Sequence, residues 1–162
     1  MFSGKFEHSL DPKDRVIVPA PLRAHLDEKH IVLSRGQERC LYLYTKTAWR
    51  REVLAGLRAS DRPYGGSRRD RDALRALQAH THVLEPDKQG RIQIPTELKR
   101  FARLDRTVVF LGVIDRIEVW AKETWKEDDV DSDEKFDQLA ASAFGRCSAQ
   151  PEENPDQRES GC

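Results

Sequence analysis

Two short runs of aliphatic residues, each ended by a proline, stand out in the pattern of hydrophobic and polar positions: VIVP at 16–19 and IQIP at 92–95. Each run predicts a short strand, because proline cannot donate to a ladder but suits the first turn of a helix. The same elements follow each run in the same order. A short helix is predicted at 19–26 and 95–102, and a second strand at 31–36 and 108–113. A third strand, which ends in aromatic residues, follows at 41–45 and 117–121, and a helix starts at 47–52 and 123–128. The pattern therefore predicts two β-α-β-β units, each with a trailing helix.

The two units are related by a constant offset, which is 87 − 11 = 76 residues for the first matching pair. Residues 5–49 and 81–125 share eight identities in 45 positions without an insertion, whereas chance would give about three. The identities include Asp11/Asp87, Arg15/Arg91, Pro19/Pro95, Leu22/Leu98, Val32/Val108, Gly36/Gly112 and Trp49/Trp125. One such unit alone can hardly bury enough surface to be stable. We therefore expect an α+β fold in which two repeats, 5–49 and 81–125, pack face to face around one shared core.

The remaining segments read as helices and a tail. Residues 50–80 form a helical connector, with apolar residues at helical spacing on both sides of a turn-rich break at 61–67. Residues 126–145 carry Phe136, Leu139 and Phe144 and predict a C-terminal helix. Residues 146–162 have almost no large apolar side chains and should form a disordered acidic tail.

Charge changes this picture, because a formal net charge of zero hides an asymmetry. Residues 126–162 hold 11 acids and 4 bases, a net of −7, so residues 1–125 hold 24 bases and 17 acids, a net of +7. A basic body permits a polyanion as partner without demanding one. No run of 18 apolar residues and no signal-like N-terminus occurs, and the three cysteines lack C-x-x-C spacing. These features favour a protein of the reducing cytoplasm, with no membrane partner.

The repeated motif is D-x-x-x-R, which places Asp11 and Arg15 around one loop and Asp87 and Arg91 around the other. Gly90 suits a positive φ in the second loop, and Asp14, at the matching position, tolerates it. One interpretation is that Asp and Arg only fix the turn, as an exposed pair contributing about 0–1 kcal/mol. We favour a turn role for the acids and for Gly90, and a phosphate or guanine contact for the arginines. A shared core would bring both basic loops onto one surface, so the predicted DNA-binding residues are Lys13, Arg15, Arg23, Lys88, Arg91 and Lys99.

The stretches MFSGKFEHSLDPKDRVIVPAPLR and DKQGRIQIPTELKRFARLD, followed by VVFLGVIDRIEVW, resemble the MraZ family of bacterial transcriptional regulators. The resemblance covers roughly residues 1–145 and places this chain among the AbrB/SpoVT-like swapped-hairpin (double-psi) barrels. It implies a ring-shaped homo-oligomer that binds repeated promoter motifs and represses the division and cell-wall gene cluster containing its own gene. It also implies that Asp11, Arg15, Asp87 and Arg91 carry the family motif. Asp14 departs from the glycine usual there, and could either weaken phosphate contact or cap the turn.

A metal site and a catalytic site are less well supported by the residues. His80 and His82, near Cys40 or His25, do not complete a recognisable metal-ligand set, so no metal and no cofactor are expected. The chain lacks the common catalytic motifs, and His8, Ser9 and Asp11 are too close in sequence to form a triad, so neither an enzyme nor a small-molecule substrate is expected. Trp49 and Trp125 should pack in the core or a subunit interface rather than stack on bases.

Two functions from different classes therefore remain. The first is a nucleoid-associated, oligomeric regulator that binds double-stranded promoter DNA. The second is an oligomeric protein-protein scaffold that uses the same barrel without specific DNA binding. The sequence does not separate repression from activation, since both begin with the same binding event.

Overall fold

The computed structural model describes residues 1–26, 29–58, 67–128 and 132–144, and the chain divides into two units, residues 1–127 and 128–162. The first repeat contains β1 (Lys5–Ser9), β2 (Arg15–Ile17), α1 (Ala20–Arg23), β3 (Ile31–Arg35) and β4 (Leu41–Thr45), followed by α2 (Lys46–Arg58). The second contains β5 (Thr81–Leu84), β6 (Arg91–Gln93), α4 (Thr96–Phe101), β7 (Thr107–Val113) and β8 (Arg116–Ala121), followed by α5 (Lys122–Asp128). Helix α3 (Arg68–Ala79) precedes the second repeat, and α6 (Asp133–Phe144) belongs to the second unit.

The predicted β-α-β-β order is found in both repeats, but each has one more strand at its start, β1 or β5, which the sequence analysis missed. The connector's two helices start at Lys46 and Arg68, and the break at 61–67 lies outside the described residues except for Ser67. Ser67 caps α3: its hydroxyl accepts from the Asp70 amide while the Asp70 carboxylate accepts from the Ser67 amide, an arrangement that stabilises a helix start. The predicted tail, 146–162, also lies outside the described residues.

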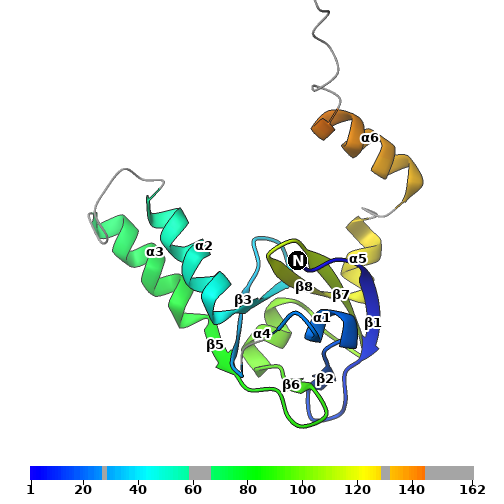
Figure 1. The fold of residues 1–162 in the computed structure, drawn as a ribbon, viewed down its shortest axis with the longest axis horizontal. Helices are drawn as coiled ribbons and strands as arrows, with labels where there is room; N and C mark the ends of the chain where they lie inside the picture. The colour runs from blue at the N-terminus through cyan, green and yellow to red at the C-terminus, as the bar shows by residue number, and fades with distance from the viewer. Residues whose placement is uncertain (27–28, 59–66, 129–131, 145–162) are drawn as a thin grey trace, which may run out of the picture. The chain divides into compact units, whose positions relative to one another are not determined.

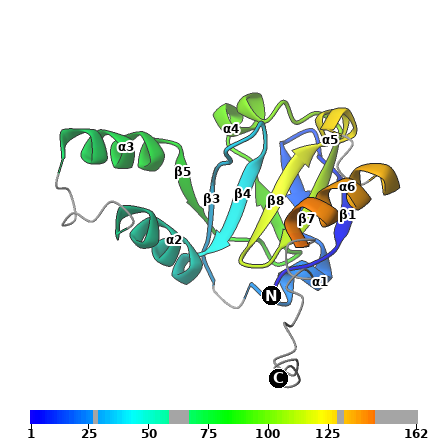
Figure 2. The same ribbon diagram turned by 90° about the horizontal axis from the view of Figure 1, so that it is seen from above.

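The strands form a six-stranded sheet in the order β1-β7-β8-β4-β3-β5 and a separate two-stranded ribbon, β2-β6, all paired antiparallel. The repeats exchange their first strands, since β1 pairs with β7 and β5 pairs with β3. Two central pairs, Val16 with Ile92 and Tyr42 with Glu118, join residues 76 positions apart. A pseudo-twofold axis therefore passes through both sheets. The fold is of the α+β class, with the strands and helices that Figures 1 and 2 show.

The main core lies between the ribbon and the large sheet. Val16 and Ile92 point inward from the ribbon and are 1% exposed, and Leu22 and Leu98 anchor α1 and α4 against the same cluster. Pro19 and Pro95 precede these two helices with φ of −51° and −58°, which is the value that proline's ring imposes. The short helices therefore start at a fixed point and hold the ribbon ends in place.

A second cluster, rich in aromatic residues, covers the other face of the large sheet. Trp125 packs on Trp120 with ring centroids 5.6 Å apart, and Trp49 packs on Tyr44 at 5.4 Å. The tryptophans occupy matched positions after β4 and β8, so their role here is packing, and burial of Tyr44 raises its pKa to about 12.

Candidate nucleic-acid interface

The β2-β6 ribbon carries the two motif arginines on its outward face. Alternation along each strand buries Val16 and Ile92, so the outward positions are Arg15, Ile17, Arg91 and Gln93. The register pairs Arg15 with Gln93 and Ile17 with Arg91, which brings both guanidinium groups onto one two-stranded surface. The side chain of Ile17, on the same face, is 42% exposed.

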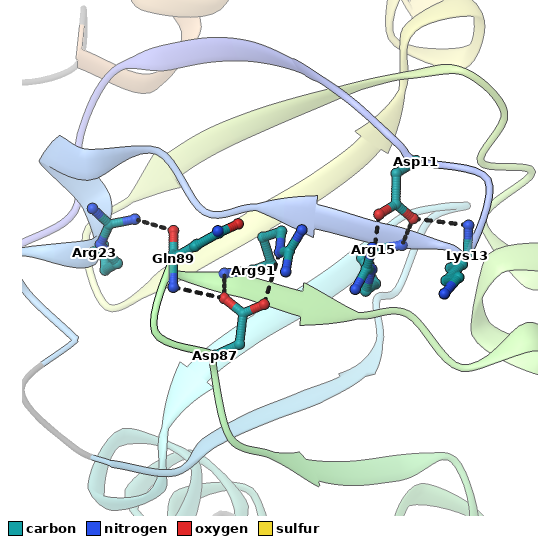
Figure 3. Close-up of polar contacts among 7 residues, drawn as sticks. All are labelled: Asp11, Lys13, Arg15, Arg23, Asp87, Gln89 and Arg91. Atoms are coloured by element: carbon teal, nitrogen blue, oxygen red, sulfur yellow. Dashed lines mark hydrogen bonds and ion pairs between the residues drawn. The ribbon is translucent and has the colours of Figure 1, made fainter.

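Loop 1, which we define as residues 11–15, is built around the Asp11 carboxylate (Figure 3). One oxygen accepts from the Lys13 amide at 2.9 Å and the Arg15 amide at 2.8 Å, and the other accepts from Arg15 Nε at 2.8 Å. The Asp11 and Arg15 backbones also pair, with Asp11 N donating to Arg15 O at 2.8 Å. One side chain thus closes the loop and orients the guanidinium.

Loop 2, residues 87–91, repeats this arrangement. Asp87 accepts from the Gln89 and Arg91 amides at 2.9 Å each and from Arg91 Nε at 2.7 Å (Figure 3). In both loops the carboxylate takes only the Nε–H of the guanidinium group, which has further donors on its two terminal nitrogens. The geometry therefore presents two preoriented guanidinium groups that keep donors for a second partner.

Hydrogen bonding also changes the acidity of these carboxylates. The Arg15 amide, the largest contributor, lowers the pKa of Asp11 below its usual 3.8, and the Arg91 amide does the same for Asp87. Both motif acids are therefore ionised throughout the neutral range, so each Asp–Arg pair is a charged one.

The third residue of each loop interior has a positive φ, 58° at Asp14 and 76° at Gly90. Each also contacts the opposite repeat through its backbone, since Ile94 N donates to Asp14 O at 2.8 Å and Val18 N donates to Gly90 O at 3.0 Å. These bonds fix both loops to the ends of the ribbon.

The other predicted cations lie around these loops. Lys99 Nζ contacts the Asp14 carboxylate at 2.6 Å. Arg23 Nη1 donates to the Val18 carbonyl at 3.4 Å and to the Gln89 carbonyl at 3.4 Å (Figure 3). Lys13 and Lys88 are exposed at the loop tips. All six predicted cations thus lie on or next to the two loops. Sequence reasoning missed Ile17 and Gln93, although strict alternation from Arg15 and Arg91 could have placed them on the same face.

The residues weighed for other chemistry are placed differently. His82 Nε2 lies 2.8 Å from Glu97, and His80 lies 3.8 Å from the other oxygen of the same carboxylate. Within the part of the chain that the structure describes, no group of three or more potential ligands could hold a metal ion. His8 packs edge-on against Phe110, while Asp11 is engaged in loop 1. Among the described helices, none is long and apolar enough to cross a membrane.

The fold and site together define a class: a two-repeat antiparallel α+β protein with a basic two-stranded ribbon on its surface. Comparison with known proteins makes this specific. The chain matches the family model of the MraZ protein over residues 1–56 and 77–147. It belongs to the MraZ family and, by this homology, is a transcriptional regulator and not an enzyme.

Individual relatives agree with the family match. The transcriptional regulator MraZ of a Thermoanaerobacter species is 37% identical over 141 residues, which cover 86% of this chain and 94% of the relative. The MraZ regulator of Pediococcus pentosaceus is 39% identical over 140 residues, covering 86% and 94%. That of Lachnoclostridium phytofermentans is 38% identical over 148 residues, covering 90% and 98%. The resemblance inferred from the sequence is thus confirmed.

Proposed function

We propose that this chain regulates transcription by inserting the β2-β6 ribbon into the major groove of promoter DNA. The single observation that carries this proposal is the pair of aspartate-oriented arginines, Arg15 and Arg91, on one exposed two-stranded ribbon. The major groove admits a two-stranded ribbon, and arginine reads the O6 and N7 edge of guanine with two hydrogen bonds. Lys13, Lys88, Arg23 and Lys99 flank the ribbon, where the phosphates of the duplex would lie.

The finer expectations from the family belong to the same proposal. One hydrophobic cluster joins residues of the ribbon and the large sheet, which supports closure of the two sheets into a swapped-hairpin barrel. Assembly of protomers into a ring would multiply weak contacts, because linked sites bind at high effective concentration. Such a ring would bind repeated motifs ahead of its own division and cell-wall gene cluster, at the nucleoid in the cytoplasm, and repress it.

Replacement of the motif arginines tests this proposal. We expect Arg15→Ala and Arg91→Ala each to weaken binding to the chain's own upstream DNA about 10- to 100-fold. Arg15→Lys keeps the charge but loses the two-pronged donor, so it should lose preference for the promoter over unrelated DNA while keeping most nonspecific affinity. Fluorescence anisotropy at two salt concentrations measures both quantities.

Arg51→Ala is the matched control, because Arg51 is an exposed arginine paired with Asp115 on the β7-β8 turn, away from the ribbon. Light scattering and melting temperature check assembly and folding of every variant. Unchanged DNA affinity of both alanine variants in an intact oligomer would overturn the proposal and favour the scaffold function instead.

A further inference from the structure

Loops 1 and 2 have the same backbone conformation but different charges. Their carboxylate cages, their positive φ residues and their backbone bonds to the opposite repeat match, position by position. Side chains therefore make the chemical difference between them. Each loop has one lysine, so the difference in net charge comes from one pair of matched positions: Asp14, beside Lys99, and Gly90, beside Arg23.

In loop 1, an acid holds the flanking cation. Lys99 Nζ lies 2.6 Å from the Asp14 carboxylate, and the two side chains are 33% and 27% exposed. Asp14 compensates the charge of Lys99 and takes one of its three N–H donors, and the same carboxylate adds a negative charge where a DNA phosphate would lie. Asp14 thus weakens loop 1 by occupying a cation and by adding repulsion.

In loop 2, the corresponding place has no side chain. A Cβ at Gly90 would overlap the Arg23 guanidinium, which lies across the loop and donates to two carbonyl oxygens rather than to a carboxylate. Carbonyl contacts at 3.4 Å orient this cation without cancelling its charge. Counted with its flanking cation, loop 2 has a net charge of +2, from the cations Arg23, Lys88 and Arg91 and the acid Asp87. Counted in the same way, loop 1 has a net charge of +1, from the cations Lys13, Arg15 and Lys99 and the acids Asp11 and Asp14.

We propose that the two halves of the ribbon contact DNA unequally: loop 2 is the phosphate anchor, and Asp14 sets the asymmetry by holding Lys99 out of the backbone contact. This inference rests on the proposed DNA-binding function and deepens it. Each phosphate neutralised by a cation steepens the dependence of log K on log salt by about 0.9. Release of Lys99 should therefore add about one phosphate contact for each bound protomer.

Reciprocal exchange of the loops tests the proposal in the full-length protein. Asp14→Gly with Lys99→Arg gives loop 1 the residues that loop 2 has at these two positions, and Gly90→Asp with Arg23→Lys does the reverse. The first exchange should bind the promoter fragment about five- to tenfold more tightly at 0.1 M salt, with a salt dependence steeper by about one. The second should bind correspondingly more weakly, with a shallower salt dependence. Asp14→Asn keeps a residue that tolerates positive φ and removes only the charge, so it should reproduce the direction of the first exchange.

Asp115→Asn is the control for the loss of a carboxylate elsewhere. Loop 1 follows the end of β1 that pairs with Thr107, whereas Asp115 lies on the β7-β8 turn at the opposite end of β7. The proposal that the loops are unequal would be overturned if wild type, both exchanges and Asp14→Asn bound DNA with the same affinity and the same salt dependence. Arg15→Ala and Arg91→Ala in the same assay separate the two failures: if they bind weakly while the exchanges change nothing, the ribbon still binds DNA but its loops are equivalent. If they bind normally, the proposed function itself fails.

Discussion

Asp11 and Asp87 each close a loop, orient an arginine and stay ionised, all through the same carboxylate. These tasks are coupled, because the amide and Nε–H bonds that shape the loop also stabilise the charged form of the acid. Removing the charge therefore weakens the loop and releases the guanidinium together. Arg15 and Arg91 are charged with or without their acids, but the acids hold them in position.

This coupling predicts an acid-dependent contribution to stability. The pKa of both acids is lowered in the folded chain, so their stabilisation is fully present above their ordinary pKa and is lost as pH falls through the lower folded value. We expect the free energy of unfolding to decline between about pH 5 and about pH 2, and to decline less steeply in Asp11→Asn/Asp87→Asn. Urea denaturation across this range measures the slope, with Asp105→Asn, at an exposed position, as control. An equal slope in wild type and the double variant would contradict the assignment.

Position 14 shows what the sequence could and could not predict about single residues. The D-x-x-x-R spacing predicted a loop, and the tolerance of aspartate for positive φ predicted a tight turn, because both are local properties of the chain. The contact of Asp14 with Lys99 joins residues 85 positions apart, and no periodicity encodes such a pairing. The sequence showed that Asp14 stands where the second loop has Gly90, but only the structure showed that Asp14 holds Lys99.

Among the elements, the exchanged first strands connect the repeats most directly. β1 reads KFEHS, with exposed Lys5 and Glu7 alternating with half-buried Phe6 and His8. Such a sequence has weak strand propensity, and its strand conformation comes from pairing with β7 at the sheet edge. Strands with a strong apolar pattern, such as β4, could be predicted from the sequence, whereas the edge strands β1 and β5 depend on a pairing partner and were not predicted.

The start of the chain adds a further contact to this edge, and it requires glycine. Phe2 and Ile114 exchange backbone hydrogen bonds, and Gly112 N donates to Gly4 O at 2.9 Å, so the segment before β1 lies directly on β7. A Cβ at Gly112 would overlap the Ser3 and Phe2 backbone. We expect Gly112→Ala to cost about 2–3 kcal/mol of unfolding free energy, in the range of overpacked sites.

Gly56 is the matched control for this change, because it lies in α2 and an added Cβ there would meet nothing within 4 Å beyond the neighbouring backbone of its own helix. Gly56→Ala should stabilise the chain by about 0.5–1 kcal/mol, as alanine does in a helix. Thermal and chemical denaturation of both variants measures the contrast. If both substitutions had the same sign, close approach of the N-terminal segment would not be the reason for glycine at 112.

For the whole molecule, most of what could be predicted about the fold followed from the internal repeat with its offset of 76 residues. A repeat too small to fold alone implies a shared core and a pseudo-twofold axis, and the structure has both. The exchange of β1 and β5 does not follow from the repeat, since an unexchanged pairing would satisfy the same pattern. That choice depends on strand register and loop length in three dimensions, which hydrophobic periodicity does not contain.

The charge distribution is the other property of the whole molecule, and it leads to a prediction about DNA association. Residues 145–162 hold four acids, Glu152, Glu153, Asp156 and Glu159, against two arginines. Neutralising these acids with Gln and Asn raises the formal net charge from 0 to +4. Charges on one chain act over about 10 Å at 0.1 M salt and about 30 Å at 0.01 M, so the acids should repel DNA mainly at low salt. We expect the neutralised chain to bind unrelated duplex DNA about two- to fivefold more tightly at low salt, with the difference disappearing near 0.3 M.

A chain with residues 145–162 in shuffled order separates net charge from any specific contact of this segment. It keeps the composition, so a long-range electrostatic effect predicts wild-type affinity for it at every salt concentration. Stopped-flow association rates provide a second measurement, because repulsion acts on encounter and should slow association rather than speed dissociation. A neutralised chain that differed from wild type only in dissociation rate, or equally at all salt concentrations, would show that these acids act through a local contact instead of the field of the molecule.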